Sequence, residues 1–378
     1  MTALGSGKLW RQHSPLLPLV DQVDDFARQS GLVRRFSHRF SALGFLTGLL
    51  QAATWGHATL CSLATLLADT GLKPMARQSM FKRLSERSTC FLELVLCSLV
   101  TRRIQTSLCS SARDSLPFRR VILEDSTTLP MSPGNHAEYP AGGGSGRSAG
   151  AKLRLMIDLL GSAVLEISRH TGATPDQALC DDALTVCAEG DLLVRDMGFF
   201  RMGSLKRLSD KGVRWLTRLP ASTSARTSDG TTLLELLTRP GAQEIDCEIV
   251  IGGSSSGAEP LRARLVARRL PQEIAERHRR ERRKKSKGQG KTASKESMER
   301  AGWTIMVTDV AALEVAAADL FSIYSQRWTV EIVFRAIKGA ARAEMALGRR
   351  RRKDHQDALI LATAIPQCWE SPNTRIAE

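Results

Sequence analysis

The sequence lacks the cysteine and histidine patterns that hold structural zinc or a disulfide framework. Its eight cysteines form no Cys-x-x-Cys pair, and its seven histidines are scattered along the chain. Structural zinc sites use closely spaced pairs of these ligands, so the sequence predicts none. We expect the cysteines to be small buried side chains or free thiols of a reducing compartment.

Two further absences narrow the class of protein. The chain shows no signal peptide, and Gln51, Thr54 and His57 interrupt its most apolar stretch, residues 42–66. A membrane-spanning helix needs about 20 consecutive apolar residues, so we expect buried helices and a cytoplasmic protein. The glycine-rich residues 132–151 lack the Gly-Lys-Ser/Thr ending of a nucleotide-binding loop, and they predict a turn or a mobile loop.

Acidic residues are outnumbered, and the excess positive charge is clustered. The chain has 54 Lys and Arg against 39 Asp and Glu, a formal net charge of +15. Residues 277–291 hold nine basic residues and one acid, and residues 349–353 are all basic. Such runs release counterions when they meet phosphate, which favours a polyanionic partner and salt-dependent binding. The first run can also be a disordered, solvated loop, and disorder is compatible with DNA contact.

Residues 324–338 carry the most specific pattern in the chain. Wound as an α-helix at about 100° per residue, they place apolar side chains on one side and polar side chains on the other. A carboxylate that binds Mg²⁺, flanked by groups that hold phosphate, suits phosphodiester chemistry. The alternative is an ordinary amphipathic helix with a charged outer face. The polar side consists of Tyr324, Arg327, Glu331 and Lys338, with Arg335 beside them.

The spacing Tyr-x2-Arg-x3-Glu-x6-Lys, from Tyr324 to Lys338, resembles the YREK signature of the IS-four-type DDE transposases of bacterial insertion sequences. The resemblance implies an α/β RNase H-like catalytic core with a β-rich insertion domain and an α-helical N-terminal domain. It also implies a Mg²⁺-dependent enzyme that cleaves DNA at insertion-element ends and transfers the freed strands into target DNA. The partners it implies are double-stranded DNA and a second copy of the chain, a homodimer on DNA in the bacterial nucleoid.

The resemblance requires two aspartates that follow hydrophobic strands and complete an Asp-Asp-Glu triad. Asp125 follows the β-branched run at residues 121–123 and precedes Ser-Thr, as at the first family position. Asp196 follows the apolar residues 192–194, and Asp-x-Gly-Phe is a recurrent family pattern. Either aspartate alone could instead be a turn residue or a helix N-cap. The competing acids are Asp158, Asp181, Asp182 and Glu124, which strand alternation points the other way.

The family's chemistry assigns roles to these residues. Asp125, Asp196 and Glu331 are expected to be both the catalytic residues and the ligands of two Mg²⁺ ions, for which Mn²⁺ can substitute. One ion would lower the pKa of the attacking water or 3′-hydroxyl, and the other would stabilise the leaving oxygen. DNA binding is expected from Tyr324, Arg327, Arg335 and Lys338.

Composition divides the chain into five parts. They are a helical N-terminal DNA-binding domain (1–112), the first part of the RNase H-like core (113–219), a β-rich insertion (220–301), the second part of the core (302–366) and an atypical short tail (367–378). In the first part, apolar spacing predicts one helix at residues 79–99. Its basic residues Arg77, Lys82 and Arg83 either meet DNA or lie on the surface of a packed helical cap.

Two alternatives to an active transposase stay open, and the short tail bears on the first of them. Only forty residues follow Lys338, and family members commonly extend further. The first alternative is a truncated, non-catalytic DNA-binding copy that acts as a transposition inhibitor. The second is an RNase H-like nuclease that cuts DNA without strand transfer.

Overall fold

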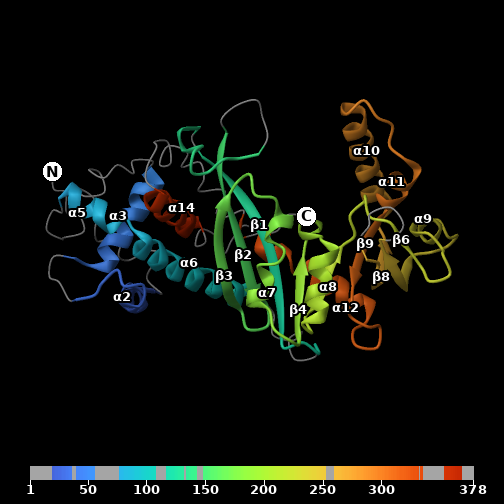
Figure 1. Ribbon diagram of the computed structural model, residues 1–378, viewed down its shortest axis with the longest axis horizontal. Helices are drawn as coiled ribbons and strands as arrows, with labels where there is room; N and C mark the ends of the chain where they lie inside the picture. Colours follow the sequence, from blue (N-terminus) through green and yellow to red (C-terminus); the bar gives the residue numbers. More distant parts are fainter. Residues whose placement is uncertain are drawn as a thin grey trace.

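A computed structural model gives the fold and describes residues 19–35, 40–55, 76–107, 116–131, 133–142, 148–252, 259–331, 333–334 and 353–367. A helical region packs at one end of a central sheet, and two further helices rise from the other end (Figure 1). Outside the described residues lie residues 59–70, whose apolar spacing also predicts a helix, the cations Arg335 and Lys338, and the tail after Gln367.

Nine described strands form one mixed sheet in the order β3-β2-β1-β4-β5-β9-β8-β7-β6. Its first three strands form an antiparallel meander of β1 (Arg120–Met131), β2 (Ala149–Asp158) and β3 (Ala163–Thr171). The next two, β4 (Asp191–Arg195) and β5 (Arg214–Arg218), run parallel to β1. The connections hold η3 (Pro133–Asn135), η4 (Asp176–Leu179), α7 (Ala183–Val186), η5 (Met197–Phe199) and α8 (Met202–Asp210).

The stretch expected to be a β-rich insertion extends this same sheet. Its strands are β6 (Ala225–Arg226), β7 (Glu244–Ile251) and β8 (Leu261–Arg269), and its helices are α9 (Leu233–Leu237), α10 (Gln272–Gly288) and α11 (Lys295–Arg300). They join the rest through β9 (Trp303–Thr308), which pairs antiparallel with both β5 and β8. Because the pairing is continuous, the boundaries between domains stay a prediction.

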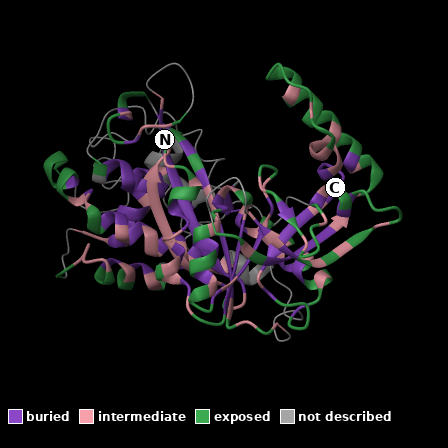
Figure 2. Cartoon of the chain, turned by 45° about the vertical axis from the view of Figure 1, so that its right-hand side comes forward, coloured by how far each residue is buried: buried purple, intermediate pink, exposed green. Residues whose placement is uncertain are grey.

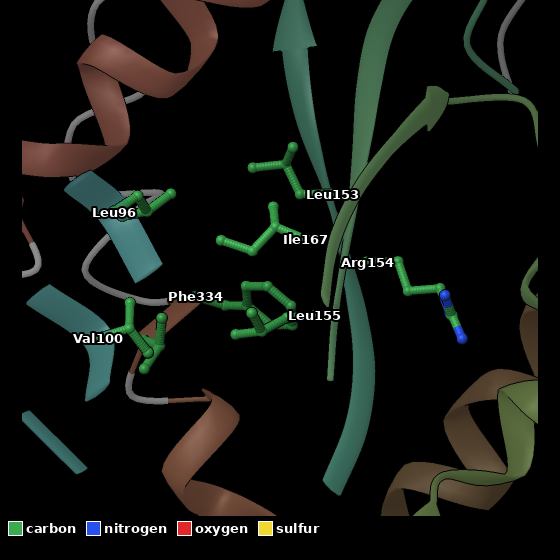
Figure 3. A pocket seen from close by; sticks show the side chains of 8 residues that line it. Leu96, Val100, Leu153, Arg154, Leu155, Ile167 and Phe334 are labelled. Atoms are coloured by element: carbon green, nitrogen blue, oxygen red, sulfur yellow. The ribbon is translucent and has the colours of Figure 1, made fainter. Parts of the chain in front are cut away.

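Side-chain alternation gives the sheet two different faces. On β2, Leu153 and Leu155 point toward the helical region, whereas Arg154 points to the opposite side (Figure 3). The first face packs against α6 (Glu86–Ser107), and α14 (Lys353–Gln367) packs against α6 and α3 (Ala42–Trp55), with α2 (Val20–Gln29) beside them. The second face has its own apolar core, which includes Trp215.

Two sequence expectations about helices are wrong. The single helix expected at residues 79–99 is two helices, α5 (Arg77–Arg83) and α6. Ser85 separates them, because its backbone N–H donates to Ser88 Oγ at 2.9 Å and so starts a new helix. The basic run after Arg277, for which a disordered loop was one interpretation, forms α10, a mostly exposed helix of 17 residues (Figure 2).

Candidate active site

The two predicted aspartates lie on neighbouring parallel strands. β1 and β4 pair with Glu124 opposite Arg195, so the residues that follow, Asp125 and Asp196, come at the same level of the sheet. Alternation points both carboxylates to the face that the helical region covers. The backbone N–H of Ser126 donates to Asp125 Oδ1 at 2.8 Å and helps to fix that carboxylate.

The signature residues reach these aspartates from α12 (Ala317–Ser325) and the turn after it. Tyr324 donates its hydroxyl to Asp196 Oδ1 at 3.1 Å. Arg327 donates from Nη1 to Asp125 Oδ2 at 2.7 Å and from Nη2 to Glu331 Oε1. The guanidinium of Arg327 therefore joins Asp125 to Glu331, and the phenol of Tyr324 binds Asp196.

The signature does not form one continuous helix. α12 ends at Ser325, residues 326–327 form a turn, and the chain is helical again from residue 328. Backbone bonds in the turn link residues three apart, as from Arg327 N–H to the Tyr324 carbonyl at 3.1 Å. Val330, Val333 and Phe334 are still buried, as expected from their spacing.

Among the described residues, Arg327 is the cation that forms ion pairs with the three acids Asp125, Asp196 and Glu331, and it reaches two of them. Burial raises the pKa of Asp125 to about 6, even though Arg327 and the Ser126 N–H act to lower it. Asp196 and Glu331 add to the rise, because like charges disfavour ionisation. Asp125 and Glu331 thus share one guanidinium while Asp196 is bound to Tyr324, and the side chains of Asp125 and Arg327 are only 17% exposed.

A divalent cation fits this excess of carboxylate charge, and the donors are the hard oxygens that Mg²⁺ prefers. The three acids do not form a coordination group in this arrangement. Within the described residues, no three Asp, Glu, His or Cys side chains are close enough to hold one metal ion. Arg327 supplies the positive charge at this place instead, through its contacts with Asp125 and Glu331.

A second charged cluster lies on the opposite face of the same strands, and sequence reasoning did not identify it. Glu124 contacts Arg154 at 2.6 Å and Arg195 at 2.7 Å, and all three side chains are completely buried. Arg154 also reaches Glu166 at 3.0 Å. The signal in the sequence was a charged residue inside each of three apolar strands. This cluster ties together β1, β2 and β4. Asp125 lies inside β1, which continues to Met131 instead of ending before the acid as expected, and Asp196 directly follows β4.

The competing acids have structural roles. Asp158 accepts the backbone N–H of Leu160 at 3.0 Å in the turn after β2, and Asp181 pairs with Arg207 at 2.6 Å near the surface. Asp182 precedes α7 without capping it through its side chain. Glu124 points away from Asp125, as predicted.

Gly198 stands two residues after Asp196. A glycine is required there because a side chain would have no room, and not because of the backbone angles. A Cβ there would lie 2.9 Å from Asp176 Oδ2. Asp176 is itself held by Lys152 Nζ and Ser126 Oγ, each at 2.6 Å. The glycine thus lets the segment after β4 approach η4 closely.

Comparison with known proteins agrees with this geometry. Residues 116–365, about two thirds of the chain, match the family model of the transposase DDE domain. The chain belongs to this family. Membership implies an RNase H-like core, with which the mixed sheet of the DDE domain is consistent. Among the described helices of this DDE protein, none has the length and apolar character to cross a bilayer.

Curated relatives resemble most of this DDE chain. The transposase for insertion sequence element IS231C of Bacillus thuringiensis subsp. berliner is 27% identical over 362 residues, which cover 89% of this chain and 72% of the relative. The transposase for IS231E of B. thuringiensis subsp. finitimus is 25% identical, covering 86% and 71%. The transposase for IS421 of Escherichia coli is 25% identical, covering 84% and 81%.

Proposed function

We propose that this chain is a DNA transposase that cleaves DNA at the ends of an insertion element and transfers the freed strands into target DNA. The observation that carries the proposal is the junction at Arg327. Its guanidinium joins Asp125 to Glu331, two acids 206 positions apart in the sequence, inside a matched transposase domain. Tyr324 brings in Asp196 from a third segment.

Asp125, Asp196 and Glu331 would hold divalent ions, with Mg²⁺ as the proposed cofactor. When bound, such ions lower the pKa of an attacking water or 3′-hydroxyl and stabilise the leaving oxygen. The protein's own part is positional. The Ser126 N–H and Arg327 hold Asp125, and the Tyr324 hydroxyl orients Asp196, so two of the acids keep fixed directions toward the phosphodiester.

DNA phosphates would be held by the cations of the signature. Arg327 lies within the site, and Arg335 and Lys338 follow it in sequence. For Arg327 to bind phosphate, it has to release at least one of its two carboxylates, which divalent ions would then take over. We further propose that the enzyme works as a homodimer on double-stranded DNA, in the bacterial nucleoid.

The test is a cleavage and strand-transfer assay with duplex DNA that carries the terminal inverted repeat flanking the coding frame. We expect wild-type protein with Mg²⁺ to give nicked and joined products. Asp196→Asn should lower the cleavage rate by more than about 100-fold, because even losing a residue that only orients a metal ligand costs 10- to 100-fold. Asp181→Asn is the matched control, since it removes an acid that is bound to Arg207 instead.

Each contrary result has a distinct meaning. Unchanged cleavage by Asp196→Asn would remove this residue from the catalytic site. DNA binding by wild-type protein without any nick, in Mg²⁺ and in Mn²⁺, would identify a non-catalytic copy. Free ends that are never joined would identify a nuclease.

A further inference from the structure

Helix α10 concentrates positive charge on a single exposed helix. It contains eight Lys or Arg against three Glu. Within the described residues none of these eight cations forms a salt bridge, whereas Arg264 and Arg300 nearby are each paired to an acid. In Figure 2 the helix stands away from the body of the molecule and is mostly exposed.

Half of the cations of α10 share one face, whereas Arg282 and Lys285 lie on the opposite one. At about 100° per residue, Arg280, Arg283, Lys284 and Lys287 fall within an arc of roughly 100°. The helix packs by another side, where Ala275 is buried, and Arg279, at the flank of that side, donates to the Met298 carbonyl at 3.3 Å. We call these four residues the basic stripe. Their side chains are all exposed, and Arg280 Nε donates to the Glu276 carbonyl of the same helix at 3.4 Å.

Helix stability does not explain the basic stripe. Glu273 in the first turn and Lys285 and Lys287 in the last turn suit the helix dipole. Arg280 and Lys284, or Arg283 and Lys287, are like charges four residues apart, and such pairs destabilise a helix. A bound polyanion would relieve this repulsion. Over the roughly 10 Å that the stripe spans, a DNA duplex presents about six phosphate charges.

Sheet topology places α10 on the catalytic side of the molecule. β8 is antiparallel to β9, which is antiparallel to β5, so β8 runs in the same direction as β1, β4 and β5. α10 follows the carboxyl end of β8, and Asp196 follows the carboxyl end of β4. Both therefore leave the sheet at the same edge, and Figure 1 shows α10 rising from that edge beside β8 and β9.

We propose that α10 is an arm that binds the phosphate backbone of duplex DNA through the basic stripe, beside the point where the strand is cut. The proposal rests on the proposed function for its choice of polyanion. Its contacts are to phosphate and not to base edges, so the arm adds affinity and positions the duplex without reading sequence.

The test compares two double variants that each remove two positive charges. Arg283→Gln with Lys284→Gln alters the basic stripe. Arg226→Gln with Arg262→Gln is the control, because both are exposed arginines beside Val250, at the amino end of β8 and so at the opposite edge of the sheet. Glutamine keeps good helix propensity, so α10 should stay folded, which circular dichroism checks. Binding of a fluorescein-labelled mixed-sequence duplex is measured by anisotropy in EDTA, so that no cleavage is involved.

We expect the stripe variant to bind the duplex roughly tenfold to a hundredfold more weakly at about 100 mM salt. The slope of log affinity against log salt should become shallower by about two, since each lost phosphate contact contributes about 0.9. The control variant should stay near wild type in both quantities. Equal losses in the two variants, or no loss in the stripe variant, would overturn the proposal. Because binding is measured without metal, this outcome is independent of whether wild-type protein cleaves DNA.

Discussion

The two faces of β1 and β4 carry neighbouring acid–arginine clusters that are built in opposite ways. On one face Glu124 and Glu166 meet two arginines, and the three central side chains are completely buried. On the other face, within the described residues, Asp125 and Glu331 pair with Arg327, Asp196 accepts from Tyr324, and Glu331 is 39% exposed. Glu124 therefore belongs to a cluster with equal numbers of acids and arginines. Its neighbour Asp125 belongs to a cluster in which, among the described residues, acids outnumber arginines.

The difference in charge balance distinguishes the Glu124 cluster, which suits a structural role, from the Asp125 cluster, which suits a chemical role. A buried ion cluster with equal numbers of acids and arginines holds strands in register, because its charged groups bind one another and not an external ligand. A partly exposed cluster with more carboxylates than paired cations is open to an external cation, and burial, with a smaller part from Asp196 and Glu331, raises the pKa of Asp125. We therefore propose that the Asp125 face carries the catalytic acids and that the Glu124 face aligns the two aspartates.

The largest expected effect on stability comes from breaking the balanced cluster. Arg195→Met leaves Glu124 with one arginine in a fully buried position. Removing one partner of a buried ion pair typically destabilises a protein by about 3–5 kcal/mol. We expect a loss of this size in the free energy of unfolding, measured by urea denaturation followed by circular dichroism.

Lys206→Met provides the control for Arg195→Met. It removes an exposed ion pair with Asp210, four residues away on α8, and should change the free energy of unfolding by less than about 0.5 kcal/mol. If the two variants were equally stable, the Glu124 cluster would not secure the strands.

A smaller effect, confined to the other face, comes from the two tyrosines. Tyr324→Phe removes the hydroxyl that orients Asp196, and we expect cleavage to slow by about 10- to 100-fold with stability little changed. Tyr139→Phe removes the hydroxyl that donates to Asp357, an acid outside the proposed triad, and should leave the cleavage rate of the folded protein unchanged. Equal cleavage by the two variants would contradict the role of Tyr324.

Local patterns in the sequence were enough to predict several strands and the positions of two candidate acids. Asp125 and Asp196 follow short apolar runs, and period-two alternation places Glu124 on the other face, as the structure confirms. The buried residues Val330, Val333 and Phe334 followed from helical spacing. These features require only the residues within one element.

What the sequence did not reveal depends on contacts between distant segments. The Arg327 junction spans 202 positions to Asp125, and a turn at residues 326–327 interrupts the helix that was expected there. The pairing of Glu124 with Arg154 and Arg195 requires three strands to be aligned first. The continuity of the sheet through β9 is likewise a matter of strand pairing, which composition does not encode.

Binding of Mn²⁺ without DNA, followed by the electron paramagnetic resonance signal of the free ion, tests the central claim most directly. If the acids form the metal site and Arg327 stands in for the ion, Asp125→Asn should bind Mn²⁺ more weakly than wild type. Arg327→Gln should bind it more tightly, because a competing cation has gone. Equal Mn²⁺ binding by all three proteins would contradict the account.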